Sequence, residues 1–319
     1  MKRRLTLSTL LVGSLLPAVS AWGATPPAGP TSQTQLTQIL TQAVSLNQLP
    51  KGLTPNPFKM DVTQPWLYSG LMYAANEHCF SASNLSTLAS PKPCLSGNLK
   101  SPTTIVLIGS SAVGSWTPAM RIAAATLNVR FASFQYEACD LAALDGIRAN
   151  CQTFHRNLPA AIKKLHPTLI IGVGGTNSGT DAVNLVYEQR LAITFDAVRA
   201  ASPTAKLALW GTTPQLKVAD ATCLLARPRA IASCGVTYSP ARSGVGEYGS
   251  VISRDAASAV LAKATLVPVQ QWFCYNNQCP AVIGSNVVFA DHMHVTEAYS
   301  KTLGYLVTAT IRHLLSATP

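Results

Sequence analysis

Beyond residue 100, short apolar runs alternate with longer patterns in which apolar residues recur at helical spacing. The apolar runs lie at 104–109, 129–134, 169–173, 207–211 and 266–269. The helical patterns lie at 118–127, 152–165, 183–200, 251–264 and 297–315. Parallel strands need a crossover connection, and a helix is the usual one. The alternation therefore predicts an α/β fold, with a parallel sheet and helices on both of its faces.

The first 21 residues read MKRRLTLSTLLVGSLLPAVSA. A basic start, an apolar centre and a small-residue exit are typical of a signal peptide, here residues 1–21. An uncleaved membrane anchor is the alternative, but the apolar stretch is short and is interrupted by Gly13 and Pro17. We expect an exported protein, periplasmic or secreted. Residues 22–50 would form a linker and a helix ending near residues 49–50, and residues 51–319 a single domain.

Eight cysteines fall into four couples that are close in sequence. The couples are Cys79 with Cys94, Cys139 with Cys151, Cys223 with Cys234, and Cys274 with Cys279. An even number of cysteines in an exported chain favours disulfides, and pairing within each couple is the simplest prediction. The alternative is a zinc site formed by Cys274, Cys279, His292 and His294. No C-x-x-C spacing supports zinc, so we expect no metal.

The run at 104–109 ends in a glycine, and Ser110 and Ser111 follow before the next helical pattern. In parallel sheets, ligands bind at the carboxyl ends of the strands, where this serine pair lies. A serine at a helix N-terminus can attack an ester while its own N–H group faces the developing oxyanion. The alternative is that one of the two serines only caps the helix.

Two further segments carry polar groups near strand ends. In FADHMHVTEAYS, Asp291 and His294 are three residues apart, a spacing at which a turn can bring the carboxylate against the imidazole. His294 could then act as general base for Ser111, with His292 as the competitor. In GVGGTNSG, the amide of Asn177 could donate to an oxyanion, with Gly175 allowing close approach, unless the segment is only a turn.

Together these blocks resemble those of the SGNH/GDSL hydrolase superfamily. More narrowly, they are similar to the SGNH domain at the C-terminus of bacterial membrane acyltransferases that O-acetylate surface glycans. The first family block usually reads G-D-S-H-A, with a tryptophan a few residues on; here residues 109–113 read GSSAV, followed by Trp116. The last block, D-x-x-H, corresponds to residues 291–294, and the G-x-N block to residues 175–177. The resemblance extends over residues 45–315.

The resemblance implies a flavodoxin-like three-layer α/β/α fold with a parallel sheet. It implies Ser111 as nucleophile, His294 as base and Asp291 as the acid that orients it. It also implies an oxyanion hole formed by the Ser111 amide and Asn177, with Gly175 in the same block. The glycine of the second family block has no clear match around residues 136–140.

Two residues of the first block depart from the family. Ser110 stands where an aspartate is usual, and Ala112 where a histidine is usual. Neither is a member of the triad, but the missing carboxylate removes hydrogen bonds that would hold the nucleophile loop. A displacement of about 1 Å in an active site can lower a rate by roughly 10²-fold. The departures therefore leave the efficiency of the site open.

We expect an exported serine esterase or O-acyltransferase that acts on O-acetyl or other acyl groups of a cell-envelope glycan, or on a small ester. Water as acceptor gives hydrolysis, and a sugar hydroxyl gives transfer. The alternative is a catalytically impaired protein with an SGNH-like fold that binds glycans or acts as a scaffold. The resemblance is to a domain fused to a membrane acyltransferase, so a separate membrane protein could be the acyl donor.

The formal net charge is +11, but the basic residues form no dense cluster. Such a charge attracts acidic glycans, although it can also serve solubility alone. An exported chain without a basic cluster is not expected to bind nucleic acid. The chemistry of an acyl-enzyme needs no cofactor, and we expect none.

Overall fold

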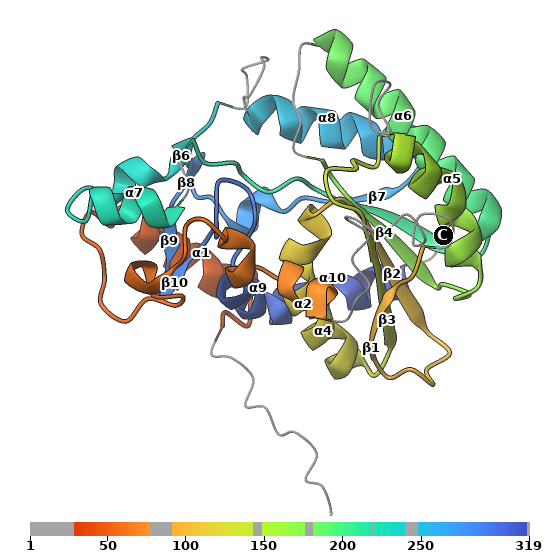
Figure 1. Cartoon of the computed structure of the whole chain (residues 1–319), viewed down its shortest axis with the longest axis horizontal. Helices are drawn as coiled ribbons and strands as arrows, with labels where there is room; N and C mark the ends of the chain where they lie inside the picture. The colour runs from red at the N-terminus through yellow and green to blue at the C-terminus, as the bar shows by residue number, and fades with distance from the viewer. Residues whose placement is uncertain are drawn as a thin grey trace, which may run out of the picture.

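A six-stranded sheet forms the centre of the protein (Figure 1), with the strand order β1-β3-β2-β4-β5-β7. The strands are β1 Cys94–Gly97, β2 Thr104–Gly109, β3 Arg130–Gln135, β4 Leu169–Val173, β5 Lys206–Trp210 and β7 Thr265–Val267. This computed structural model describes residues 29–76, 91–142, 149–175, 181–217, 220–239 and 248–317. Strand β1 pairs antiparallel with β3, and the other neighbours are parallel.

The five parallel strands confirm the predicted α/β class, and their order is the flavodoxin-like one. The first of them in the chain, β2, lies between β3 and β4. The chain therefore leaves the sheet toward opposite sides after β2 and after β4, which makes the carboxyl ends of these strands a switch point. Ligands bind in the crevice at such points, and Ser111 follows β2 directly.

Helices cover both faces of the sheet, as the burial of all six residues of β2 requires. Ile105 and Leu107 belong to one core cluster, and Val106 and Ile108 to another on the opposite face. Residues of α4 (Ala112–Leu127) and α10 (Gly304–Ser316) complete the first cluster. Residues of α5 (Ala149–Lys163), α6 (Asp181–Ala201) and α8 (Tyr248–Leu261) complete the second. Figure 1 shows the resulting three layers.

Helix α4 begins six residues earlier than the expected start at Pro118, since its first residue is Ala112. Proline has no N–H, so Pro118 leaves the carbonyl of Gly114 without the usual donor four residues later. Gly70 lies against this point: a Cβ atom placed on it would be 1.9 Å from the Gly114 oxygen and 2.6 Å from Pro118 Cδ. The segment that contains Gly70 therefore packs on α4 at the turn where the backbone hydrogen bond is missing.

The remaining elements surround one end of the sheet and the α4 face. The helices are α1 Gln33–Val44, α2 Leu71–Asn76, α7 Asp220–Ala226 and α9 Glu297–Thr302, with the 3₁₀ turns η1 Pro57–Lys59, η2 Pro65–Tyr68, η3 Ile231–Cys234 and η4 Gln270–Trp272. The short strands are β6 Val236–Thr237, β8 Gln278–Cys279, β9 Val282–Ile283 and β10 Asn286–Val287. Leu36 and Leu40 of α1 pack into the core cluster that contains α4.

Three further expectations about the elements were wrong. Helix α1 ends at Val44 rather than near residues 49–50. The terminal helical pattern is two helices, α9 and α10, separated at Leu303. Strand β1 is not among the predicted strands, because only its first residue, Cys94, is buried and it has no apolar run.

Three of the four predicted disulfides are present. They join Cys139 to Cys151, Cys223 to Cys234 and Cys274 to Cys279. The last of these removes two thiolates from the zinc alternative. Cys79 lies outside the described residues, so its pairing with Cys94 stays a prediction, as does the signal peptide. Among the described residues, no helix is both long enough and apolar enough to cross a membrane.

Candidate active site

Ser111 lies between the end of β2 and the first residue of α4. Gly109 ends the strand with φ of 154°, a conformation that side chains rarely adopt, and this allows the chain to turn into the helix. Ser111 is the residue that precedes α4, but its side chain makes no capping hydrogen bond. The capping alternative is therefore not what the structure shows for Ser111, and its hydroxyl is directed elsewhere.

The hydroxyl of Ser111 meets the imidazole of His294. The Ser111 Oγ atom lies 2.8 Å from His294 Nε2, across 183 residues of sequence. On the other side of the ring, His294 Nδ1 lies 2.6 Å from Asp291 Oδ2. The structure thus brings together the three residues expected to form a Ser-His-Asp arrangement. Asp291 contacts the His294 ring on one side, and Ser111 contacts it on the other.

A tight turn holds the Asp291 carboxylate in place. Its Oδ1 atom accepts hydrogen bonds from the backbone N–H groups of Met293, at 2.8 Å, and His294, at 2.7 Å. Burial alone would raise the pKa of Asp291, but the hydrogen bonds and charge of His294 and the N–H of Met293 outweigh it and lower the pKa below its ordinary value. The carboxylate therefore stays ionised beside the imidazole.

The His294 turn is tied to neighbouring elements by its backbone. The carbonyl of His294 accepts from Ala290 N–H at 2.7 Å, and Val295 N–H donates to the Ser115 hydroxyl of α4 at 3.0 Å. His292, the competing histidine, is exposed, and its carbonyl accepts from Leu216 N–H. The geometry selects His294 over His292 as the partner of Ser111.

A pocket of about 440 Å³ opens onto these three side chains. Pro65, Trp66 and Leu71 form an apolar wall, and Glu137 is the additional acidic residue in the lining. None of these four residues was singled out from the sequence. Pro65, Trp66 and Leu71 precede the first strand in a segment without periodicity. Glu137 follows β3, in a segment where the glycine of the second family block has no clear match. Only the tertiary structure brings them to Ser111.

Of the three predicted oxyanion residues, the structure describes Ser111 and Gly175. The Ser111 N–H group is at the N-terminal end of α4, where the helix dipole is positive. Asn177 lies outside the described residues, so its role stays a prediction. Gly175 is described, and its place differs from the expected one beside an oxyanion. Its N–H donates to Tyr187 Oη at 2.8 Å, and its carbonyl accepts from Arg254 Nη2 at 2.6 Å and Thr212 Oγ1 at 2.9 Å.

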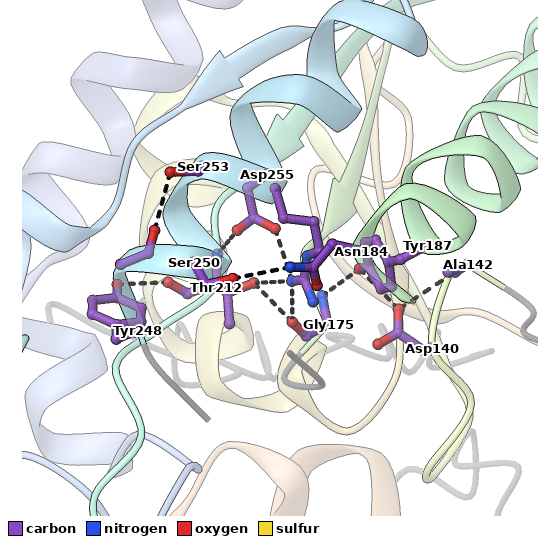
Figure 2. A network of polar contacts seen from close by, with 12 residues as sticks. Asp140, Ala142, Gly175, Asn184, Tyr187, Thr212, Tyr248, Ser250, Ser253 and Asp255 are labelled. Atoms are coloured by element: carbon purple, nitrogen blue, oxygen red, sulfur yellow. Dashed lines mark hydrogen bonds and ion pairs between the residues drawn. The ribbon is translucent and has the colours of Figure 1, made fainter. Parts of the chain in front are cut away.

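Gly175 belongs instead to a buried polar network at the carboxyl ends of β4 and β5 (Figure 2). A Cβ atom on Gly175 would lie 1.5 Å from Asp140 Oδ2, so the close approach that requires a glycine is that of a protein carboxylate. Asp140 also accepts from Tyr187 Oη at 3.0 Å. Burial raises the pKa of Asp140, partly offset by the charge of Arg254.

Arg254 is the cation at the centre of this network and is only 1% exposed. Its guanidinium carbon lies 3.8 Å from the centre of the Tyr187 ring, and Nη2 donates to Asp255 Oδ1 at 2.9 Å. Asp255 Oδ2 in turn accepts from Thr212 N–H at 2.7 Å. The network joins α6 and α8 to the loops that follow β4 and β5, and it fixes the start of the segment that carries Asn177.

Comparison with known proteins identifies one family and a fold. The family described as "SGNH domain (fused to AT3 domains)" matches residues 78–309. No curated protein matches the sequence. The periplasmic domain of a lipopolysaccharide acetyltransferase from Salmonella ser. Paratyphi A is similar in structure, with a TM-score of 0.58, 15% identity, and coverage of 79% of this chain and 98% of that chain.

A carbohydrate esterase of family 2 from Corynascus thermopiles is more distant, with a TM-score of 0.41, 12% identity, and coverage of 68% of each chain. At 15% identity, the similarity to the Salmonella domain shows the fold alone. The family match covers most of the chain and includes Ser111, the segment at Gly175, Asp291 and His294. The chain therefore belongs to the SGNH domain family, whose members act on ester bonds.

Proposed function

We propose that this protein is a serine-dependent enzyme that transfers the acyl group of an ester to water or to a sugar hydroxyl. One observation carries the proposal: Ser111 Oγ, His294 and Asp291 form a continuous chain of contacts of 2.8 and 2.6 Å beside a pocket. A serine that only capped a helix would direct its hydroxyl to the backbone of the first turn.

In the proposed mechanism, Ser111 Oγ attacks the ester carbonyl as His294 Nε2 accepts its proton. The ionised Asp291 fixes the imidazole tautomer and stabilises the imidazolium. The Ser111 N–H group, together with the Asn177 amide, would donate to the oxyanion. His294 then protonates the departing alcohol, which leaves an acyl-Ser111 ester. Water or a sugar hydroxyl, deprotonated by His294, attacks this ester and regenerates Ser111.

We further propose that the substrate is an acylated glycan outside the cytoplasm. The support is indirect: the family is described as fused to AT3 domains, and one structural neighbour is the periplasmic domain of a lipopolysaccharide acetyltransferase. The three disulfides are consistent with export. By analogy with the fusion, a membrane acyltransferase domain would be the acyl donor if the reaction is a transfer.

The direct test is hydrolysis of p-nitrophenyl acetate by the purified protein and by the variants Ser111→Ala and His294→Ala. Matched controls are Ser316→Ala and His313→Ala, because both residues are exposed on α10, away from the pocket. We expect turnover by the wild type and both controls, and background rates for the two site variants. A serine-reactive fluorophosphonate should label the wild type but not Ser111→Ala. Absence of both turnover and labelling in the folded wild type would favour a glycan-binding protein.

A further inference from the structure

The apolar wall of the pocket comes from a segment outside the family match. Pro65 and Trp66 belong to η2, and Leu71 begins α2, whereas the match starts at residue 78. The Ser111 side of the pocket is thus built from residues inside the family match, and the facing wall from residues that precede it.

Close backbone contacts hold this segment against α4. Gly70 and Gly114 meet so closely that a Cβ atom on Gly70 would lie 1.9 Å from the Gly114 oxygen. A Cβ atom on Gly114 would in turn lie 2.6 Å from Leu71 Cδ2. Because Gly114 is in the first turn of the helix that Ser111 precedes, the wall has a fixed distance from the nucleophile.

The same segment is also bound to α9, which follows His294. Ser69 forms an isolated β-bridge with Thr296. Tyr73 Oη donates to Glu297 Oε1 at 2.6 Å, and the Arg121 guanidinium lies 4.3 Å from the centre of the Tyr73 ring. The wall is therefore anchored on both elements that position the reacting groups, and it is a preformed part of the site.

The chemistry of the wall favours an acyl chain over a sugar ring. Apart from the triad, Glu137 is the one charged side chain in the described lining, and Trp66 adds a single indole N–H donor. A polyhydroxylated alcohol against Pro65, Trp66 and Leu71 would leave its hydroxyl groups without partners, which costs free energy. An alkyl chain has no such groups and gains from burial against Trp66, which is 40% exposed in the free protein.

We propose that this apolar wall binds the acyl chain of the substrate, and that the chain is longer than acetyl. This inference rests on the proposed function and specifies the acyl group. A pocket of about 440 Å³ is far larger than an acetyl group needs. Glu137, at the same pocket, disfavours acyl chains that end in a carboxylate, because like charges repel.

The test compares the wild type on p-nitrophenyl acetate, butyrate and hexanoate. Each methylene buried in an apolar site gains about 0.8 kcal/mol, a factor of roughly four, so kcat/KM should rise tenfold or more from acetate to butyrate. Trp66→Ala should remove most of this rise, and Trp66→Phe should keep much of it. Phe58→Ala is the matched control, because Phe58 is an exposed aromatic of the same N-terminal segment, outside the triad pocket.

A second measurement does not depend on turnover. Folded Ser111→Ala protein should bind the hexanoate ester at least tenfold more tightly than the acetate, and Trp66→Ala added to this variant should equalise the two affinities. A wild type that hydrolyses acetate but shows a flat or falling chain-length profile would overturn this inference and leave the proposed function intact. Loss of all turnover, with chain-length-dependent binding retained, would instead overturn the proposed function. Equal binding of the two esters would overturn the acyl-chain assignment in either case.

Discussion

The carboxylate of Asp291 binds His294 twice, through Oδ2 to the ring nitrogen Nδ1 at 2.6 Å and through Oδ1 to the backbone N–H at 2.7 Å. In the mechanism that we propose, the first contact sets the tautomer in which Nε2 can accept the Ser111 proton. Asp291→Asn would keep an acceptor for the backbone but present an NH₂ group to Nδ1, which favours the opposite tautomer. We expect kcat to fall by about 10⁴-fold with little loss of folding, measured by ester hydrolysis and thermal unfolding. An Asp291→Asn enzyme with near wild-type kcat would exclude this role.

The lowered pKa of Asp291 fixes the sign of its pH effect on stability. Its burial opposes ionisation, but its contacts with His294 and Met293 favour it. A carboxyl with a folded pKa below its unfolded value of about 3.9 stabilises the protein above that pH, and the contribution is lost as pH falls through the folded pKa. The stability difference between wild type and Asp291→Asn should thus shrink as the pH falls from about 5 through the folded pKa of Asp291, as measured by urea unfolding. A difference that grew on acidification would contradict the lowered pKa.

The buried Arg254 should be important for stability and for the loop after β4. Arg254→Met would leave Asp255 and Asp140 buried without their cation, which typically costs about 3–5 kcal/mol of unfolding free energy. Arg254→Lys keeps the charge but not the planar contact with Tyr187. Its loss of unfolding free energy should therefore be smaller than that of Arg254→Met. Urea unfolding of both variants checks the order. Equal stability of Arg254→Met and wild type would show that the network contributes nothing.

The close contact of Gly70 with Gly114 predicts that Gly70 tolerates no side chain. In Gly70→Ala the new Cβ would meet a backbone oxygen at 1.9 Å, so η2 and α2 must move away from α4. We expect a lower unfolding midpoint and a flatter acyl chain-length profile, because the pocket wall moves with the segment. Gly211→Ala is a suitable control, since its Cβ would meet nothing closer than 3.3 Å. If Gly70→Ala retained both properties, the segment would not be fixed as described.

The Ser110 hydroxyl should contribute little. Its hydrogen bond in the structure is a long one of 3.4 Å from Ala112 N–H. Ser110→Ala should therefore change kcat/KM by less than about threefold, since a bond this long adds little. A much larger loss would show that the hydroxyl replaces the carboxylate usual at this position. Ester hydrolysis beside wild type is sufficient for this comparison.

The parts of the fold that depend on local patterns could be predicted from the sequence. The runs at 104–109 and 169–173 coincide with β2 and β4, because both strands are buried on two faces and read as continuous apolar stretches. Thr296 directly precedes the helical pattern at 297–315, and its Oγ1 accepts from Tyr299 N–H at 3.1 Å as the N-cap of α9. Short-range signals of this kind survive in any tertiary context.

Features that depend on tertiary contacts could not be predicted. The start of α4 was placed too late because Pro118 reads as a helix start, although Gly70 packing compensates for it inside the helix. Trp66 reaches the pocket only because its segment docks on α4. Gly175 reads as a turn or oxyanion glycine, and only the position of Asp140 reveals why a side chain is excluded there. These contacts join residues that are far apart in the sequence, so no local sequence pattern indicates them.

The Ser111–His294 contact has a consequence for the order in which the chain matures. Ser111 and the strands β2, β3 and β4 around it come from the first 173 residues of the sequence, whereas His294 follows Ser111 by 183 residues. A growing or truncated chain that lacks residue 294 would hold Ser111 without the proton acceptor that we propose. We therefore expect reactivity toward esters only in chains long enough to bring His294 against Ser111.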